Sequence, residues 1–377
     1  MRILYLPNAY SQQRQREKKR KIYPVLMAME AEWYRKQGHE VEWKIPYEHK
    51  ICKCDNDMLT FFHPVYVDTK SGECFNCGRT VNYAFDLQLW TPKKIREEEI
   101  WREKQYFKKQ YDKIITEPEG LPFLSLPYPD REFTRWWEYQ DNGNFKYRPG
   151  TYIQAANGCH WGKCSFCVEN GKPYEVRPVE DVIEEIKECK AMGFKEVFDD
   201  SGTFPKGRWL DLFCKSVHNV GCYIGCNVRL CDMDYNQMKW AGFRMLLFGL
   251  ESANQRTLDK INKGVKVEDY KYIIKAAKCG LEPHVAVMFG YPWETDREAV
   301  NTLRLVHYLL RKGYAKTAQA SFYQSRGCAS QSSHRTYVKK IYDVWKYPDF
   351  WFNKIRDIKN VDDLKYLWRC IKAGLNG

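Results

Sequence analysis

Apolar and polar positions recur at two different periods along the chain, and they predict α/β structure from the first residues onward. Residues 2–6 form a short apolar run typical of a strand, and residues 24–37 repeat apolar side chains at helical spacing. Gly38 is well placed to end that helix, and the alternating stretch 39–45 predicts a second strand. A strand, a helix and a strand in this order are typical of a doubly wound, Rossmann-like α/β domain.

From residue 151 onward, strand-like and helix-like segments follow one another in regular succession. Strands are predicted at residues 152–157, 194–200, 222–229, 244–251, 284–292 and 317–323. Helical spacing is clear over residues 179–189, 269–279 and 297–310. Six β-α units in succession predict a parallel sheet curled into a partial (β/α)6 barrel, with its chemistry at the carboxyl ends of the strands.

A polar stretch around residues 142–149 separates the two patterns, and we place a domain boundary there. The predicted organisation is an N-terminal α/β domain over residues 1–145, a barrel over 146–328 and a helical C-terminal extension over 329–377. Between residues 47 and 80 the regular pattern of the first domain dissolves, which we interpret as an insertion that bears cysteines.

The chain has 377 residues and a formal net charge of +13, which favours polyanionic partners such as RNA. A basic run at residues 14–21 supplies much of the excess, and a solvated charged face is the plainer explanation. No stretch reaches the roughly 18 apolar residues that a membrane span needs. The N-terminus enters a strand-like run without an apolar signal region. We therefore expect a cytoplasmic protein without a membrane partner.

Fifteen cysteines are many for a chain of this kind, and their clustering suggests metal or redox chemistry. Cys159, Cys164 and Cys167 lie just beyond the first predicted barrel strand, separated by four and then by two residues. Three thiolates on one such loop can hold three irons of a [4Fe-4S] cluster and leave the fourth iron open. A zinc site that lacks its fourth ligand and a set of unrelated free thiols are the alternatives.

The loop GCHWGKCSFC resembles the cluster-binding loop of the radical S-adenosylmethionine (radical SAM) superfamily, and the resemblance covers about residues 150–325. The likeness is greatest to the group that carries an N-terminal domain of the cobalamin-binding type. The commonest loop of the superfamily has three residues between its first two cysteines, so the four found here put the cluster geometry in question. The resemblance implies that the open iron binds S-adenosylmethionine, whose reductive cleavage gives a 5′-deoxyadenosyl radical.

Polar side chains at successive strand ends resemble the contacts that the superfamily makes to this cofactor. Asp199, Asp200 and Ser201 stand at the end of the second barrel strand, where the resemblance implies a contact to the cofactor's amino group. Later strand ends carry residues that resemble its carboxylate, ribose and adenine contacts: Asn227, Arg229, Glu251, Ser252, Met288, Phe289 and Gly290. The segment LDKINKG, which ends in Lys263 and Gly264, is also similar to this group.

The resemblance implies cobalamin in the first domain, bound through an Asp-x-His-x-x-Gly loop, but residues 1–150 contain no such motif. A separate group of cysteines in that domain is spaced like two metal knuckles and predicts a zinc site: Cys52, Cys54, Cys74 and Cys77. A second iron–sulfur cluster and free thiols are the alternatives there. Cys328, after the sixth barrel strand, is a candidate catalytic residue, although an ordinary loop thiol would look the same.

Together these features predict a radical SAM enzyme that methylates or rearranges an unreactive carbon of a small molecule, a peptide or an RNA. Such an enzyme needs an electron donor such as ferredoxin or flavodoxin. An RNA-modifying radical SAM enzyme and a non-catalytic zinc-binding interaction protein are the alternative functions.

Overall fold

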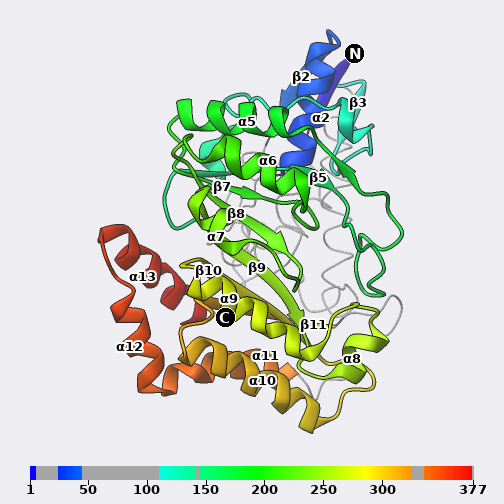
Figure 1. The fold of residues 1–377 in the computed structure, drawn as a ribbon. Helices are drawn as coiled ribbons and strands as arrows, with labels where there is room; N and C mark the ends of the chain where they lie inside the picture. The colour runs from blue at the N-terminus through cyan, green and yellow to red at the C-terminus, as the bar shows by residue number, and fades with distance from the viewer. Residues whose placement is uncertain (6–23, 45–109, 141–144, 324–334, 376–377) are drawn as a thin grey trace, which may run out of the picture. The chain divides into compact units, whose positions relative to one another are not determined.

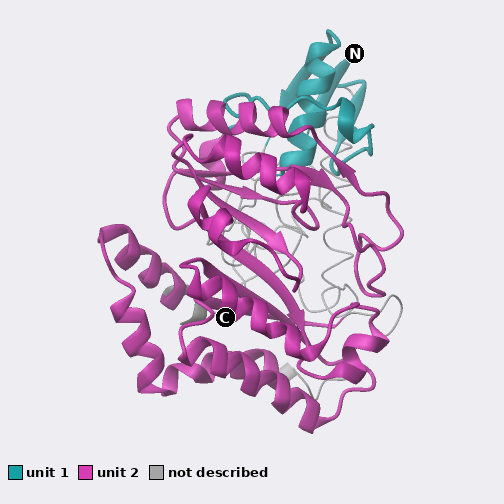
Figure 2. Cartoon of the chain, viewed as in Figure 1, with its two compact units in different colours: residues 1–135 teal, residues 136–377 magenta. Residues whose placement is uncertain are grey.

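The computed structural model describes residues 1–5, 24–44, 110–140, 145–323 and 335–375. The chain divides into two compact units, residues 1–135 and residues 136–377 (Figure 2). Within the described ranges, no helix is both long enough and apolar enough to cross a membrane.

The first unit contains a small parallel sheet and one long helix. Strand β1 (Arg2–Tyr5) lies between β2 (Glu40–Trp43) and β3 (Lys113–Ile115), and both neighbours run parallel to it. Helix α2 (Val25–Lys36) separates β1 from β2 in the chain and ends before Gly38, whose φ of 79° suits a residue without a side chain. The predicted strand–helix–strand order of this unit is confirmed.

The second unit is built on a six-stranded parallel sheet whose strands follow one another in chain order (Figure 1). The strands are β4 (Gly150–Ile153), β7 (Glu196–Asp199), β8 (Tyr223–Val228), β9 (Phe243–Glu251), β10 (Glu282–Phe289) and β11 (Thr317–Phe322). Every neighbouring pair is parallel, so each strand reaches the next through a crossover. The sheet curls into a half-barrel, which confirms the predicted fold class.

Helices follow the strands and continue into the C-terminal tail. Those of the half-barrel are α5 (Val179–Ala191), α6 (Arg208–Val217), α7 (Tyr235–Trp240), α8 (Gln255–Lys260), the 3-10 helix η5 (Val267–Tyr270), α9 (Lys271–Lys278) and α10 (Asp296–Arg311). The tail forms α11 (Arg335–Lys340), the 3-10 helix η7 (Ile341–Lys346), α12 (Pro348–Arg356) and α13 (Val361–Leu375).

The segment predicted as the first barrel strand, residues 152–157, is divided in two. After β4 the chain leaves the parallel sheet, and β5 (Ala156–Asn157) pairs antiparallel with β6 (Glu175–Val176). The backbone of Ala155 explains the break, because its N–H donates to the carboxylate of Asp199 at 2.6 Å. Its carbonyl accepts the N–H of the residue after β6 at 2.9 Å. Both groups are therefore satisfied outside the parallel ladder.

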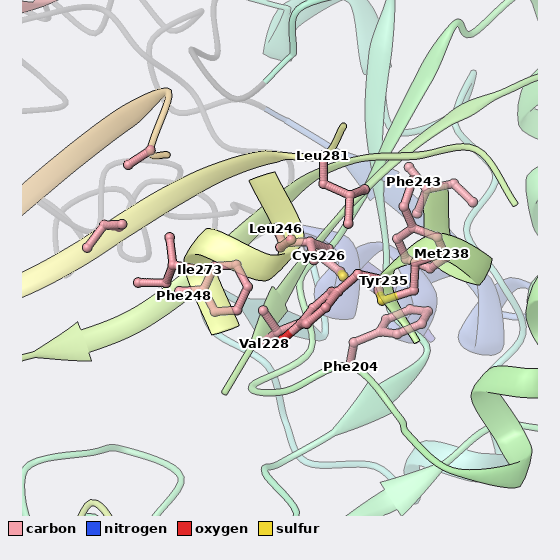
Figure 3. Close-up of a cluster of buried hydrophobic side chains, with 14 of the residues drawn as sticks. Phe204, Cys226, Val228, Tyr235, Met238, Phe243, Leu246, Phe248, Ile273 and Leu281 are labelled. Carbon is pink, nitrogen blue, oxygen red and sulfur yellow. The ribbon is translucent and has the colours of Figure 1, made fainter. Parts of the chain in front are cut away.

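One continuous apolar core lies between the sheet and the helices that cover it. Cys226 of β8 and Phe248 of β9 are fully buried in this core together with Met238 of α7 and Ile273 of α9 (Figure 3). Along β10 every second residue is buried, whereas the residues between them are only partly buried. The period of two thus separates a helix-facing side of the sheet from a concave side.

A buried ion network joins the amino-terminal ends of three barrel strands. Arg244 of β9 donates to Glu196 of β7, and their side chains are 3% and 0% exposed. Arg244 also reaches Glu282 of β10 at 2.7 Å. Lys146 binds Glu282 at 2.7 Å and Asp363 of α13 at 2.5 Å. The network therefore ties the C-terminal helix to the base of the half-barrel.

We expect Arg244→Met to lower the free energy of unfolding by about 3–5 kcal/mol, because it leaves the buried carboxylate of Glu196 without its charged partner. Urea unfolding followed by circular dichroism measures the change. Lys187→Met is the matched control, since it breaks the exposed pair of Lys187 and Glu184 and should cost less than about 1 kcal/mol. Equal costs for the two variants would contradict a structural role for the network.

Candidate functional site

The three cysteines of the predicted cluster lie on the loop between β5 and β6. Cys164 is buried, and Cys159 and Cys167 are partly buried. Gly158 opens the loop with a φ of 85°, and a Cβ atom there would lie 2.4 Å from the carbonyl oxygen of Pro173. Only glycine therefore fits at the start of this loop without a shift of the backbone.

Each of the three sulfur atoms has a hydrogen-bond donor nearby. The donors are the Oγ1 hydroxyl of Thr203 to Cys159 (3.0 Å), the backbone N–H of Glu169 to Cys167 (3.4 Å) and Nη1 of Arg229 to Cys164 (3.9 Å). Donors of this kind stabilise a thiolate, and they also influence the reduction potential of an iron–sulfur cluster.

The first two thiols differ in how their surroundings affect ionisation. Burial disfavours the thiolate of Cys159, but the hydrogen bond from Thr203 and two backbone N–H groups of the loop outweigh it, so its pKa lies below the ordinary value. Burial prevails at Cys164 and raises its pKa, although the positive charges of Lys263 and Arg229 act in the opposite direction. Cys159 is therefore the better prepared of the two to act as a thiolate ligand.

A single metal ion has no evident site in the part of the chain that the structure describes. No three His, Cys, Asp or Glu side chains are placed there to hold one ion. A cubane cluster makes a different demand, because each cysteine binds its own iron at a separate corner. Three thiols on one loop, each with a hydrogen-bond donor, have the chemistry that such a cluster requires of its ligands.

The loop that follows α8 braces the cysteine loop from the side. Trp161 donates its indole N–H to the carbonyl oxygen of Asn262 at 2.8 Å, and Ser165 donates its backbone N–H to Ile261 at 2.9 Å. A Cβ atom at Gly264 would lie 2.1 Å from the Trp161 ring, so this position has room for glycine alone. The segment LDKINKG, for which the sequence suggested no role, is thus a support for the cysteine loop.

Glu251, predicted as a ribose contact, forms an ion pair in the structure. Its carboxylate lies 2.8 Å from Nζ of Lys263, and the two side chains are 10% and 8% exposed. Gly249 makes room for the pair, since a Cβ atom there would lie 2.6 Å from the Glu251 carboxylate. Glu251 has a φ of 60°, a left-handed conformation that turns the chain out of β9.

The acidic segment at the end of β7 places its members differently. Asp199 and Ser201 are fully buried, and their side chains accept the backbone N–H groups of Ala155 and Ala156 at 2.6 and 2.8 Å. Asp200 lies between them and is exposed to solvent. Of these acids, Asp200 is the one with access to a ligand.

The other predicted cofactor contacts fall on both sides of the sheet. Asn227 and Met288 alternate with core residues and are only partly buried, which places them on the concave side. Ser252 and Phe289 are fully buried and belong to the framework. The backbone N–H of Gly290 donates to the carboxylate of Glu294 at 2.7 Å. Their roles in cofactor binding stay predictions.

The remaining predicted site cysteines lie outside the described residues: Cys52, Cys54, Cys74, Cys77 and Cys328. The zinc site and the catalytic role of Cys328 therefore stay predictions.

Glu294 is a buried acid at the carboxyl end of β10. Its side chain is 7% exposed, and burial raises its pKa to about 7, against the hydrogen bond from Gly290. An acid with a raised pKa holds its proton more tightly in the folded state than in the unfolded state. The contribution of Glu294 to stability is therefore lost as the pH rises from the unfolded pKa, near 4.5, to about 7.

We expect Glu294→Gln to be more stable than the wild type at pH 8 by about 1–3 kcal/mol, and this advantage to disappear near pH 4.5. Gln keeps an oxygen for the Gly290 N–H and carries no charge at either pH. Urea unfolding of both proteins at the two pH values gives the difference. Glu268→Gln, at an exposed position, is the control and should show no such pH dependence. Equal stabilities at both pH values would rule out a buried, proton-binding Glu294.

The fold and the loop together define a class of protein: a parallel half-barrel with a loop of three cysteines at its carboxyl edge. Residues 153–306, from the end of β4 into α10, match the model of the radical SAM superfamily. The chain therefore contains a region that is similar to radical SAM domains.

Two curated relatives share part of the sequence. The first relative, from Methanocaldococcus jannaschii, is named as a methylthiotransferase whose activity is only provisionally assigned. It is 29% identical over 250 residues, which are 62% of this chain and 51% of the relative. An uncharacterised methyltransferase of Pyrococcus horikoshii is 28% identical over 217 residues, covering 53% of this chain and 46% of its own. The chain thus spans about half the length of these relatives.

Solved structures share the fold. TsrM of Kitasatospora setae, a radical S-adenosylmethionine methyltransferase solved with tryptophan and a cofactor analogue, has a TM-score of 0.52 and 17% identity, covering 85% of this chain and 72% of its own. OxsB is a cobalamin-dependent S-adenosylmethionine radical enzyme solved with aqua-cobalamin and S-adenosylmethionine bound. It has a TM-score of 0.53 and 11% identity, and the match covers 94% of this chain and 56% of OxsB. At such low identity the likeness is one of fold.

Proposed function

We propose that this chain is a radical SAM enzyme in which Cys159, Cys164 and Cys167 hold a [4Fe-4S] cluster. The observation that carries the proposal is the set of three thiols on one loop, each with its own donor, in a half-barrel that matches the superfamily. When bound, the cluster supplies one electron to S-adenosylmethionine, whose C5′–S bond breaks to give methionine and a 5′-deoxyadenosyl radical.

The residues of the concave side have separate tasks in this proposal. Asp200 accepts a hydrogen bond from the cofactor's ammonium group, and the positive charge of that group favours the ionised carboxylate. The amide of Asn227 is oriented by its own hydrogen bond to the carbonyl oxygen of Ser201 at 3.0 Å and binds a polar group of the cofactor. Met288 offers an apolar surface for the adenine. Trp161 keeps the cysteine loop in place while the cofactor binds.

The names of the two curated relatives favour transfer of a methyl or methylthio group to an unreactive carbon. The substrate is a small molecule, a peptide or an RNA, and a ferredoxin or flavodoxin supplies the electron. The first unit is a candidate cobalamin domain, because an open parallel α/β sheet binds ligands at its carboxyl edge. Residues 1–150 contain no Asp-x-His-x-x-Gly motif, so other residues of this unit would hold the cobalamin.

Cys164→Ala tests the proposal in protein prepared and reconstituted without oxygen. We expect the wild type to bind about four irons per chain and to release 5′-deoxyadenosine from S-adenosylmethionine under a reductant, and the variant to lose both properties. Cys189→Ala is the matched control, since Cys189 is a fully buried core residue of α5 and should leave both unchanged.

A wild-type protein that binds zinc but no iron, and leaves S-adenosylmethionine intact, would instead establish a zinc-binding interaction protein. S-adenosylhomocysteine formed by protein that contains a corrinoid would indicate methyl transfer. Iron content and cofactor cleavage that survive Cys164→Ala would refute the ligand assignment.

A further inference from the structure

The resemblance to the superfamily implies that Arg229 contacts the cofactor, but the contacts of Arg229 in the structure point to a different role. It follows β8 and is 8% exposed. One end of its guanidinium group, Nη2, donates to the carbonyl oxygen of Lys263. The other end, Nη1, lies 3.9 Å from Sγ of Cys164, and the group lies over the ring of Trp161 at 4.9 Å from its centre. The guanidinium therefore contacts both the cysteine loop and the loop that follows α8.

These contacts leave little freedom for Arg229 to bind a ligand carboxylate. A planar guanidinium has a rigid fork of donors, and here both arms of the fork are already directed at protein atoms. Stacking on Trp161 holds the plane of the group. An arginine that recognises a free carboxylate presents both arms to it, so the observed geometry argues for a different partner.

The charge of Arg229 is directed at sulfur. In the described part of the chain no ion pair joins it to a carboxylate within 4.0 Å. Its Nη1 lies 3.9 Å from Sγ of Cys164, so a buried positive charge lies beside one of the three proposed ligands. A charge this deeply buried is screened much less than an exposed one.

We propose that Arg229 is a positioning residue for the cluster and not a carboxylate contact of S-adenosylmethionine. In this role Arg229 holds Cys164 against the loop that follows α8, and its charge raises the reduction potential of the cluster. The inference rests on the proposed function. Reduction adds negative charge to the cluster, and a nearby cation stabilises the reduced form. Hydrogen bonds to the sulfur atoms act in the same direction. Thr203, the donor to Cys159, therefore contributes in the same sense without a charge.

Potentiometric titration of the reconstituted full chain, followed by electron paramagnetic resonance of the reduced cluster without S-adenosylmethionine, tests the proposal. At the wild-type midpoint, Arg229→Gln should lower the ratio of reduced to oxidised cluster about tenfold, which is about 59 mV for one electron. Arg229→Lys keeps the charge and should lower the midpoint potential by a smaller amount. Thr203→Val should shift the midpoint in the same direction by a smaller amount.

Lys206→Gln is the matched control. Lys206 is an exposed cation whose charge also acts on the cysteine loop at His160, but it is hydrated. Its removal should leave the midpoint unchanged, because solvent screens an exposed charge. An equal shift in Lys206→Gln and Arg229→Gln would show that net charge alone matters and would overturn the assignment to Arg229.

The affinity for S-adenosylmethionine, measured by equilibrium binding, separates the two roles of Arg229. An unchanged midpoint together with at least tenfold weaker binding in Arg229→Gln would make it a carboxylate contact and overturn the proposal. If Arg229→Gln assembles no cluster, Arg229→Lys decides, and an unchanged midpoint together with at least tenfold weaker binding of S-adenosylmethionine in that variant refutes the proposal. A wild-type chain that binds no iron would refute the proposed function itself. Iron analysis before the titration therefore distinguishes that outcome from a failure of the proposal for Arg229.

Discussion

The candidate site depends on one packing contact, that of the Trp161 ring on the backbone of Gly264. The cysteine loop contains no helix or strand between β5 and β6, so its shape comes from its neighbours. Trp161 covers the position where a side chain at Gly264 would lie, and it also donates to the carbonyl of Asn262. The guanidinium of Arg229 stacks on the same ring. The placement of the thiols is thus coupled to the ends of β8 and α8, and a change at any of these positions is felt by the others.

Buried polar groups build the frame of the site, and partly exposed ones face its open side. Asp199 and Ser201 use their side chains to hold the backbone that leads into the cysteine loop, and the result is that Asp200 is left free to meet a ligand. The pair of Glu251 and Lys263 ties the end of β9 to the loop that follows α8. Such pairs contribute little net stability, because the loss of hydration offsets their attraction, but they fix one arrangement.

The opposite end of the half-barrel is organised by charge as well. The network around Arg244 joins the first residues of β7, β9 and β10 to α13. Rigid strands at that end let the loops at the carboxyl end carry the chemistry, which is the usual division in α/β barrels. The two ends are therefore stabilised by separate sets of contacts.

Local pattern was enough to determine the fold class, the order of the barrel strands and the three cysteines on one loop, because alternation and Cys spacing are properties of short stretches. It did not reveal that residues 152–157 divide, since that break comes from hydrogen bonds with Asp199 and with the residue after β6, both distant in the chain. Nor did it distinguish Asp199 from Asp200, or show that Arg229 turns to Cys164 and that Thr203 donates to Cys159. Trp161 carried no signal of its own, because its partner lies about a hundred residues away. Which side of the sheet a polar residue faces, and what it meets there, is decided only when strands far apart in sequence are packed side by side.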